Sequence, residues 1–469
     1  MDTVNLHTPS LDKLPAYVWQ QLSRIAQQCA LVPEKQHWVV AFSGGKDSSA
    51  LAHLCASLHQ QGKLPQLTLM HIHHGLQACA DEWITHTQQQ AAKWQVPFVY
   101  QKVDVNPVSR HSTEALARDA RYKALRSYCR QHKGVLLMAH HLDDVLETVL
   151  LQLKRGAGPK GLAGMAEIAE HEGIIHARPL VGIEQKILID YLHTNNIDYI
   201  EDPSNSDQTF DRNFVRHSVV PLLTERWPAI RHTVARSARL CAQQDSMIQA
   251  QVEHWLQTHL TPLGCIPMEP LSQQPLSWQK EIVRHWCQSI SNQLPSEAQL
   301  ETFFNALSAA DDKQPELRFA KVALRKYKAH LYLISNYATD RKDVSDCQTV
   351  DKDIAIKSLK LTLQRRARAA DDSPLFTLPL EADSQVTVKA VPKNARITLL
   401  NQTQPRSLSR YLKDWGIPPW TRDDCYLLCK DGEAMALLAY GQCEPLKRVD
   451  HSKCDQPTIA WISVSLLTD

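Results

Sequence analysis

The sequence predicts an α/β fold, a parallel sheet with helices on both faces, followed by a helical domain and a small β-rich C-terminal domain. Over about the first 200 residues, strand-like apolar runs alternate with segments whose apolar residues recur at helical spacing, as in β-α-β units. After Pro221 the helical spacing continues without such strands in between. Toward the end of the chain, β-branched runs broken by proline and glycine indicate strands joined by turns.

The N-terminal elements follow from these patterns. Strands are predicted at residues 38–42, 66–71, 98–103 and 135–139. Helices are predicted directly after residue 48 and at 81–95, 113–131 and 142–154. The last helix is the most regular, because its apolar positions recur with a helical period throughout. Since parallel sheets bind ligands beyond the carboxyl ends of their strands, a site is expected in the loops at those ends.

The rest of the chain is long enough for further domains, because 469 residues exceed the size of one ordinary core. Helices are expected between residues 226 and 310, a hairpin at 317–334, a polar linker at 339–353 and a helix at 406–415. The expected core of the helical domain comprises Trp255, Trp278, Trp286, Phe303 and Phe304. We therefore predict domains at residues 1–220, 221–338 and 354–469.

The composition is that of a globular protein with a nearly balanced charge, 52 basic against 50 acidic residues. The 12 cysteines include no Cys-x-x-Cys pair, and Cys425, Cys429, Cys443 and Cys454 fit no usual zinc pattern, so free thiols are expected. The N-terminal residues lack a basic region followed by an apolar block, and no apolar run approaches membrane length. We therefore expect a cytoplasmic protein without a membrane partner.

The most informative motif is Ser43-Gly44-Gly45-Lys46-Asp47-Ser48, at the predicted change from the first strand to a helix. Main-chain N–H groups at a helix start, beside glycines that lack a Cβ, form a binding site for phosphate. Because Asp47 would repel phosphate unless a cation lay between them, the spacing suggests Mg2+-bound pyrophosphate chemistry. The alternative is purely structural, with Ser43 as the helix cap and Asp47 at the positive end of the helix dipole.

A second polar cluster follows the fourth predicted strand. It comprises His140, His141, Asp143 and Asp144, with Glu147 one helical turn further on. Capping explains one carboxylate at a helix start, but so many titratable groups at the mouth of a phosphate site indicate catalysis. Residues 71–75 follow the second strand and are expected at the same edge of the sheet.

Two arginine pairs lie at helical spacing. Arg118 and Arg121 suit a triphosphate or a leaving pyrophosphate, although a surface pair between Glu114 and Arg118 would explain them equally well. Arg212 and Arg216 share a helix face and are suited to nucleic-acid phosphate. Between the pairs, the glycine-rich residues 156–164 are expected to form a loop, and residues 201–205 a turn.

In chain order, these motifs resemble those of the tRNA(Ile)-lysidine synthetases, a family of N-type ATP pyrophosphatases with a PP-loop. The motifs are the Ser43 loop, Ala117-Arg118-x-x-Arg121-Tyr122, Ala139-His140-His141-Leu142-Asp143-Asp144, residues 155–164, residues 201–205 and Arg212-Asn213-x-x-Arg216. The resemblance covers residues 37–216, and residues 408–441 are more loosely similar to the C-terminal domain of that family.

The resemblance implies an ATP-dependent ligase that joins free L-lysine to C2 of cytidine 34 in the CAU anticodon of tRNA(Ile). The reaction would pass through an adenylated cytidine and give lysidine, AMP and pyrophosphate. Because an amine with a pKa near 10.4 is almost fully protonated at pH 7, a carboxylate or histidine must lie near the lysine amine. Homodimers are common among related enzymes.

The resemblance also assigns site residues. It implies ATP at Ser43, Gly44, Gly45, Lys46, Asp47 and Ser48, with Mg2+ held partly by Asp47. The implied catalytic residues are Asp47, Arg118, His140, Asp143 and Asp144, and the implied RNA-binding residues are Arg212 and Arg216.

Three other classes share some of these features. A small-molecule ligase with the same loop would need an ammonia source, and no candidate glutaminase segment precedes the loop. A tRNA thiolase with the same loop would need paired cysteines, and none is suitably spaced here. A non-catalytic protein that binds an adenine nucleotide and RNA would have little use for adjacent aspartates beside phosphate.

Overall fold

The computed structural model describes residues 9–73, 75, 80–103, 113–291, 294–308, 315–320, 322–335, 347–350, 353–356, 359–366, 375–380, 384–392, 394–400, 402–446 and 460–466. The chain divides into two compact units, Met1–Ile248 and Gln249–Asp469. None of the described helices combines the length and the apolar character that a membrane span requires.

The first unit is built on a six-stranded sheet in the order β3-β2-β1-β4-β6-β5. Its strands are β1 (His37–Ala41), β2 (Leu67–His73), β3 (Phe98–Lys102), β4 (Gly134–Leu137), β5 (Ile168–His171) and β6 (Ile174–Ala177). All neighbours are parallel except β5, which pairs with β6 in the antiparallel sense. The predicted α/β fold is thus confirmed, with an antiparallel edge strand that the sequence analysis does not predict.

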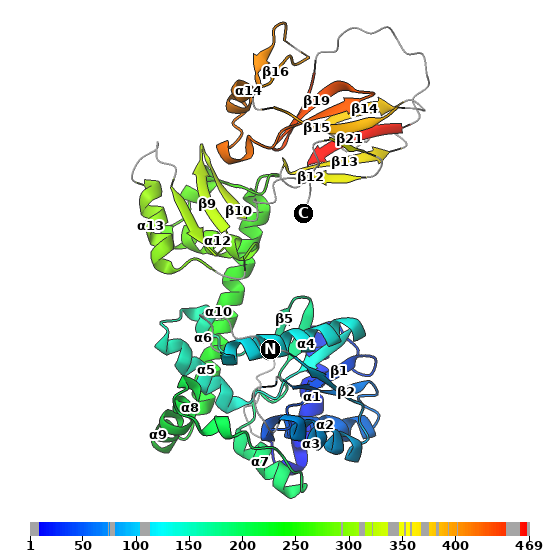
Figure 1. Ribbon diagram of the computed structural model, residues 1–469. Coiled ribbons are helices and arrows are strands. Elements are labelled where there is room, and N and C mark those ends of the chain that lie inside the picture. The colour runs from blue at the N-terminus through cyan, green and yellow to red at the C-terminus, as the bar shows by residue number, and fades with distance from the viewer. Residues whose placement is uncertain are drawn as a thin grey trace. The chain divides into compact units, whose positions relative to one another are not determined.

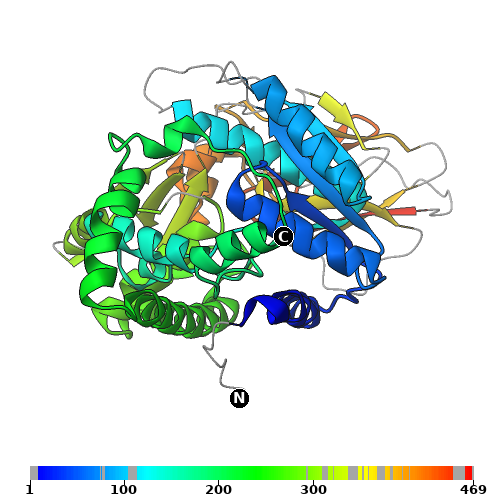
Figure 2. The ribbon, with the colours of Figure 1, turned by 90° about the horizontal axis from the view of Figure 1, so that it is seen from below.

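Helices lie on both sides of this sheet (Figures 1 and 2). They are α1 (Leu14–Gln28), α2 (Lys46–Gln60), α3 (Ala80–Lys93), α4 (Thr113–His132), α5 (Leu142–Lys154) and α7 (Gln185–Thr194). Side chains alternate along β1, so Trp38 and Val40 pack with α1, α2 and α7, while Val39 packs with α4 on the opposite face. The strand is buried on both faces, as parallel strands usually are.

Further elements differ from those predicted. Helices α1 and α7 are not predicted, although the apolar residues of each pack against the sheet. The glycine-rich segment, predicted as a loop, contains the short helix α6 (Pro159–Leu162). Pro159 stands at its first position, where the fixed φ of proline favours a helix start and no N–H is needed.

The first unit continues with an uninterrupted helical segment at residues 211–226. It consists of α8 (Asp211–Phe214), the π-helical turn η3 (Val215–Val219) and α9 (Val220–Arg226). The wide turn precedes Pro221, which has no N–H to donate and crowds the preceding turn of a helix. Helix α10 (Ile230–His259) follows.

The second unit contains helices and several antiparallel sheets. Its helices are α11 (Met268–Ser272), α12 (Leu276–Gln288), α13 (Glu297–Ser308) and α14 (Leu408–Asp414). One sheet has the order β7-β10-β9-β8, with β7 (Ile266–Pro267), β8 (Glu316–Phe319), β9 (Val322–Tyr327) and β10 (His330–Ser335). Of the expected core, Trp286, Phe303 and Phe304 are buried, whereas Trp255 and Trp278 are only half-buried.

The C-terminal part is β-rich, as expected. One sheet has the order β11-β15-β18-β19-β20 and another β12-β13-β21-β14. The strands are β11 (Cys347–Thr349), β12 (Ile354–Ile356), β13 (Leu361–Arg366), β14 (Phe376–Leu380), β15 (Val386–Ala390), β18 (Tyr426–Lys430), β19 (Glu433–Ala439), β20 (Gln442–Pro445) and β21 (Ala460–Leu466). The expected linker at 339–353 lies mostly outside the described residues, and the predicted domain boundaries stay predictions.

Candidate active site

A cavity of about 720 Å³ opens at the carboxyl ends of β1, β2 and β4. Its apolar wall comes from the strand ends, and its polar wall joins the loop at 43–48 to the segment at 139–144. These two motifs are far apart in sequence but follow neighbouring parallel strands. The strand order therefore explains why they meet, and the cavity lies where such folds bind ligands.

The loop before α2 has the geometry of a phosphate-binding site. Helix α2 begins at Lys46 with Gly45 as its cap, and no side chain caps it. Ser43 does not cap the helix; its hydroxyl lies 3.0 Å from that of Ser48. The N–H groups of the first helical turn have no acceptor within the helix, and they carry the positive end of its dipole.

Gly44 holds this loop against the rest of the unit. Its φ is +88°, and its carbonyl accepts a hydrogen bond of 2.8 Å from the N–H of Ile200. A Cβ at this position would lie 2.5 Å from Cδ1 of Ile200 and 2.9 Å from Cγ2 of Thr87. Glycine is therefore required here both by the backbone conformation and by space.

Gly44→Ala is expected to lower the stability by about 2 kcal/mol or more, because alanine must adopt a left-handed conformation and overlap Ile200. The binding of ATP should weaken as well, since the loop must move. Thermal unfolding and an ATP titration measure the two effects. Gly45→Ala is the stability control, because its Cβ would have no neighbour closer than 3.6 Å. Equal melting temperatures for the two variants would contradict the argument.

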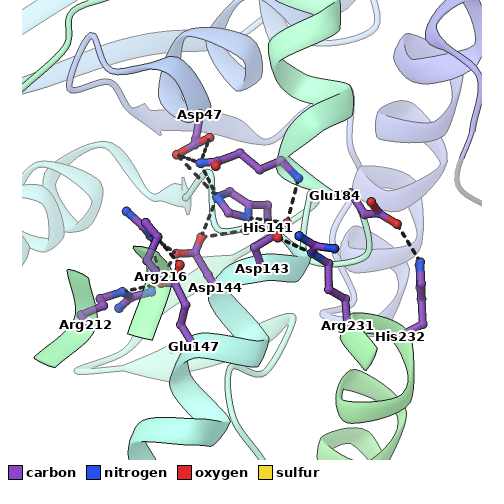
Figure 3. Close-up of polar contacts among 11 residues, drawn as sticks. Asp47, His141, Asp143, Asp144, Glu147, Glu184, Arg212, Arg216, Arg231 and His232 are labelled. Atoms are coloured by element: carbon purple, nitrogen blue, oxygen red, sulfur yellow. Dashed lines mark hydrogen bonds and ion pairs between the residues drawn. The ribbon is translucent and has the colours of Figure 1, made fainter. Parts of the chain in front are cut away.

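Asp47 and His141 are joined by Gln185, a residue that the sequence analysis does not single out. The Gln185 side-chain nitrogen donates to both oxygens of Asp47, at 3.0 and 3.2 Å, and lies 3.1 Å from Nε2 of His141. Figure 3 shows His141 between Asp47 and the two aspartates of α5. The amide thus fixes the orientation of a carboxylate at the cavity wall.

The buried imidazole and carboxylate at this point stabilise each other's charge. Burial lowers the pKa of His141, but the carboxylates of Asp144, Asp47 and Asp143 outweigh it and raise the pKa above its usual value. Burial raises the pKa of Asp144, but the positive charges of His141 and Arg212, with the hydrogen bond from the backbone N–H of His141, lower it to about 2. Asp144 is therefore ionised at neutral pH.

Two arginines bind the acidic side chains of α5. The carboxylate of Glu147, whose side chain is 2% exposed, accepts hydrogen bonds from Arg212 at 2.9 Å and from Arg216 at 2.6 and 2.9 Å. Arg212 also donates to Asp144 at 2.7 Å. Both guanidinium groups lie against Asp144 and Glu147, which we call the acidic cluster (Figure 3). The two positions predicted to bind RNA therefore also hold this cluster in place.

Asp143 faces a different set of partners. One of its oxygens accepts the backbone N–H of Gln185 at 2.9 Å, and the other pairs with Arg231 on α10. Asp143 thus binds the first N–H of α7, and it does not line the cavity. Its predicted catalytic role stays a prediction, and the contacts give it a positioning role toward Gln185.

His140 lines the cavity as a neutral group. Burial lowers its pKa to about 3, with Arg178 adding to the effect and Asp144 opposing it. Arg178 donates from Nε to Nδ1 of His140 at 3.2 Å, so the proton of the neutral ring is on Nε2. At neutral pH His140 is therefore suited to donate a hydrogen bond and is a poor base.

Arg118 and Arg121 both lie over the ring of Tyr122, at 5.2 and 5.3 Å from its centre. Arg121 and Tyr122 line the cavity, whereas Arg118 is exposed beside it. Glu114, the alternative partner of Arg118, lies outside the residues whose side chains are described. The predicted role of Arg118 in stabilising charge therefore stays a prediction.

The residues present fit a Mg2+ ion shared with a nucleotide. Among the described residues, no three His, Cys, Asp or Glu side chains are grouped so that they could hold a metal ion by themselves. Mg2+ usually takes one or two protein carboxylates together with phosphate oxygens and water, and Asp47 offers one carboxylate beside the phosphate-binding N–H groups. The thiols of Cys425, Cys429 and Cys443 are buried and form no disulfide, and Cys454 lies outside the described residues.

Sequence comparisons assign three parts of the chain. Residues 17–223 match a PP-loop domain, 267–332 a TilS substrate binding domain and 386–456 a TilS substrate C-terminal domain. The parallel sheet, the phosphate-binding loop and the adjacent acidic cluster accordingly define a PP-loop protein.

The relatives identify the family within this class. The tRNA(Ile)-lysidine synthase of Serratia proteamaculans is 34% identical over 88% of this chain and 93% of its own length. That of Escherichia coli O157:H7 is 33% identical over 86% of this chain and 91% of its own length. The chain therefore belongs to the tRNA(Ile)-lysidine synthase family.

A solved structure is also similar in part. The U34-tRNA thiolase NcsA from Methanococcus maripaludis aligns with a TM-score of 0.42 at 16% identity, over 50% of this chain and 80% of that chain.

Proposed function

We propose that this protein is a ligase that uses ATP to join free L-lysine to C2 of cytidine 34 in the CAU anticodon of tRNA(Ile). The observation that carries the proposal is one cavity lined both by a phosphate-binding helix start and by the carboxylates of Asp47 and Asp144, in a chain of this family. The products are lysidine, AMP and pyrophosphate. The same family membership favours this function over thiolation and over a non-catalytic nucleotide-binding protein.

ATP binds with its phosphates against the N–H groups of the loop formed by Ser43, Gly44, Gly45, Lys46, Asp47 and Ser48. The apolar strand ends, among them Met70, Ile72 and Met138, offer a surface for the adenine base. Asp47 would hold Mg2+, which neutralises charge on the phosphate oxygens when bound. Gln185 keeps the Asp47 carboxylate in the orientation that this requires.

In the first step, O2 of the cytidine attacks the α-phosphate, the new P–O bond forms and pyrophosphate leaves. His140 donates a hydrogen bond from Nε2, and Arg118 stabilises negative charge on the phosphates. In the second step, the ε-nitrogen of lysine attacks C2, the C2–O bond breaks and AMP leaves with that oxygen. Asp144 binds the amine and stabilises the positive charge that develops on nitrogen, and the excess proton passes to solvent.

The remaining roles concern the partners. Arg212 and Arg216 are about a quarter to a third exposed, and their outer N–H groups are proposed to meet an RNA phosphate. Free lysine is the amine donor, the reaction takes place in the cytoplasm, and a homodimer is the expected assembly.

The test is pyrophosphate release from ATP, measured with and without tRNA(Ile) and lysine, followed by mass analysis of the recovered tRNA. The proposal expects release only with tRNA, and a tRNA mass increased by one lysine less one water. Release without tRNA would favour a small-molecule ligase, and no release under any condition would favour a nucleotide-binding protein without activity.

A further inference from the structure

Exposed aromatic side chains lie in and directly beside the helical segment 211–226. Phe210, directly before α8, is 43% exposed, and Phe214 at its end is 49% exposed. Leu222 and Trp227 are exposed as well, so exposed large apolar side chains gather in this short stretch of the described chain. A grouping of this kind indicates an interaction surface.

The same segment forms part of the cavity wall. Arg216 and His217 line the cavity, and the ring of His217 lies 2.9 Å from the carbonyl of Asn205, which also lines it. Phe214 lies two positions from Arg212 and two from Arg216, and on a helix this spacing places its side chain on the side opposite to theirs. The arginines bind the acidic cluster, so Phe214 faces away from it. Phe210 is the extended residue that directly precedes α8, and its side chain is exposed.

The proposed reaction needs an unpaired RNA loop as substrate, and this surface has the side chains that bind such a loop. A cytidine that enters the cavity must leave the stack of its neighbours, and those neighbours lose a stacking partner. Aromatic side chains commonly replace such a partner in complexes with single-stranded RNA. The flanking helices also carry exposed cations, Arg226 on α9 and Arg236 and Arg239 on α10, which complement phosphate charge.

We propose that Phe210 and Phe214 stack on the unpaired anticodon-loop bases that flank the reacting cytidine. This inference rests on the proposed function, because it takes the tRNA anticodon loop as the ligand. The two side chains do not touch the reacting atoms. They position the loop, so the cytidine reaches the cavity at low tRNA concentration.

The test is a double-mutant cycle between the protein and an RNA hairpin that carries the anticodon loop. Binding is measured without ATP for the intact hairpin and for hairpins with an abasic site on either side of the target cytidine. With the wild-type protein, removing the correct flanking base should weaken binding by about fivefold to a hundredfold. The Phe214→Ala variant should bind the intact hairpin more weakly than the wild-type protein does, by a similar factor. Removing the flanking base should then weaken the binding of this variant little further.

Matched variants separate stacking from other causes. Phe214→Trp should keep the affinity and Phe214→Leu should lose it, because leucine is apolar but has no ring. Val32→Ala shortens an exposed apolar side chain, 51% exposed, that lies outside this segment and should have no effect. Arg226→Ala should reduce the salt dependence of binding, whereas Phe214→Ala should leave the slope unchanged. Thermal unfolding confirms that each variant is folded.

Kinetics give a second measurement with full-length tRNA. Phe210→Ala and Phe214→Ala should raise KM for tRNA and leave kcat at saturating tRNA unchanged. Equal abasic-site effects in wild type and variant, or equal affinity of the leucine and tryptophan variants, would overturn the inference and favour a protein partner for this face. The binding measurement needs no ATP, so it tests the stacking independently of the reaction. If the wild-type protein has no ligase activity but still shows the coupling between Phe214 and the flanking base, the proposed reaction is refuted and the stacking inference stands.

Discussion

Asp47→Ala is expected to lower kcat by about a thousandfold or more while the protein remains folded. The carboxylate lies at the helix start that would hold the phosphates, and its side chain is 27% exposed. Without it, a bound Mg2+ loses its protein ligand, and Gln185 and His141 lose the acceptor that aligns them. The cost to stability should be small, because an acidic side chain in the first helical turn contributes about 0.3–1 kcal/mol. Pyrophosphate release and circular dichroism measure the two effects.

Asp47→Asn distinguishes charge from shape. Asparagine keeps a side-chain oxygen that can accept the hydrogen bond from Gln185, but it carries no charge and is a poor ligand for Mg2+. If the charge is needed, this variant is as inactive as Asp47→Ala. Added Mg2+ should then also raise the ATP affinity of both variants less than it raises that of the wild-type protein. A fully active Asp47→Asn would show that the residue only positions Gln185 and His141.

Much of the N-terminal unit can be predicted because its signals are local. Buried parallel strands appear as short apolar runs, and helix α5 begins and ends where its apolar period does. The meeting of the Ser43 loop and the His140 segment also follows from the sequence, since strand ends of a parallel sheet share one edge. Helix α1 is missed because an alternation of strands and helices does not require a helix before the first strand.

The contacts that complete the candidate site could not be predicted from local patterns. Gln185, Arg178 and Arg231 reach Asp47, His140 and Asp143 from segments that lie far along the chain. Glutamine does not titrate, and a single arginine is ordinarily a surface residue. The only available hint is that an acidic cluster so large must be neutralised by cations from elsewhere in the fold.

Arg212 and Arg216 show a second feature that residue spacing alone does not predict, namely what a helix face contacts. Their spacing correctly indicates a common helix face, but spacing does not say what that face meets. The structure turns both guanidinium groups toward Asp144 and Glu147, and it is the phenylalanines between and before them that face outward. The same helix can thus organise the acidic cluster on one side and present a different surface on the other.

Glu147→Gln is expected to cause the largest loss of stability among single substitutions at this site. Glu147 is almost fully buried and accepts three hydrogen bonds from two guanidinium groups. Its amide analogue would leave two cations, each at most 30% exposed, without their main counter-charge. Breaking such a buried pair costs about 3 kcal/mol, which corresponds to a fall in Tm of roughly 6–12 °C for a domain of this size.

The matched control is Asp211→Asn, which breaks the ion pair between Lys154 and Asp211. That pair is equally close, at 2.6 Å, but both side chains are 61% exposed, so the loss should stay below about 1 kcal/mol. In the double variant Glu147→Gln/Arg216→Gln, one unpaired cation is removed, and part of the lost stability should return. If Glu147→Gln melts at the same temperature as the control, the acidic cluster does not hold the segment 211–226 in place. Activity would then depend on Glu147 only through direct contact with a substrate.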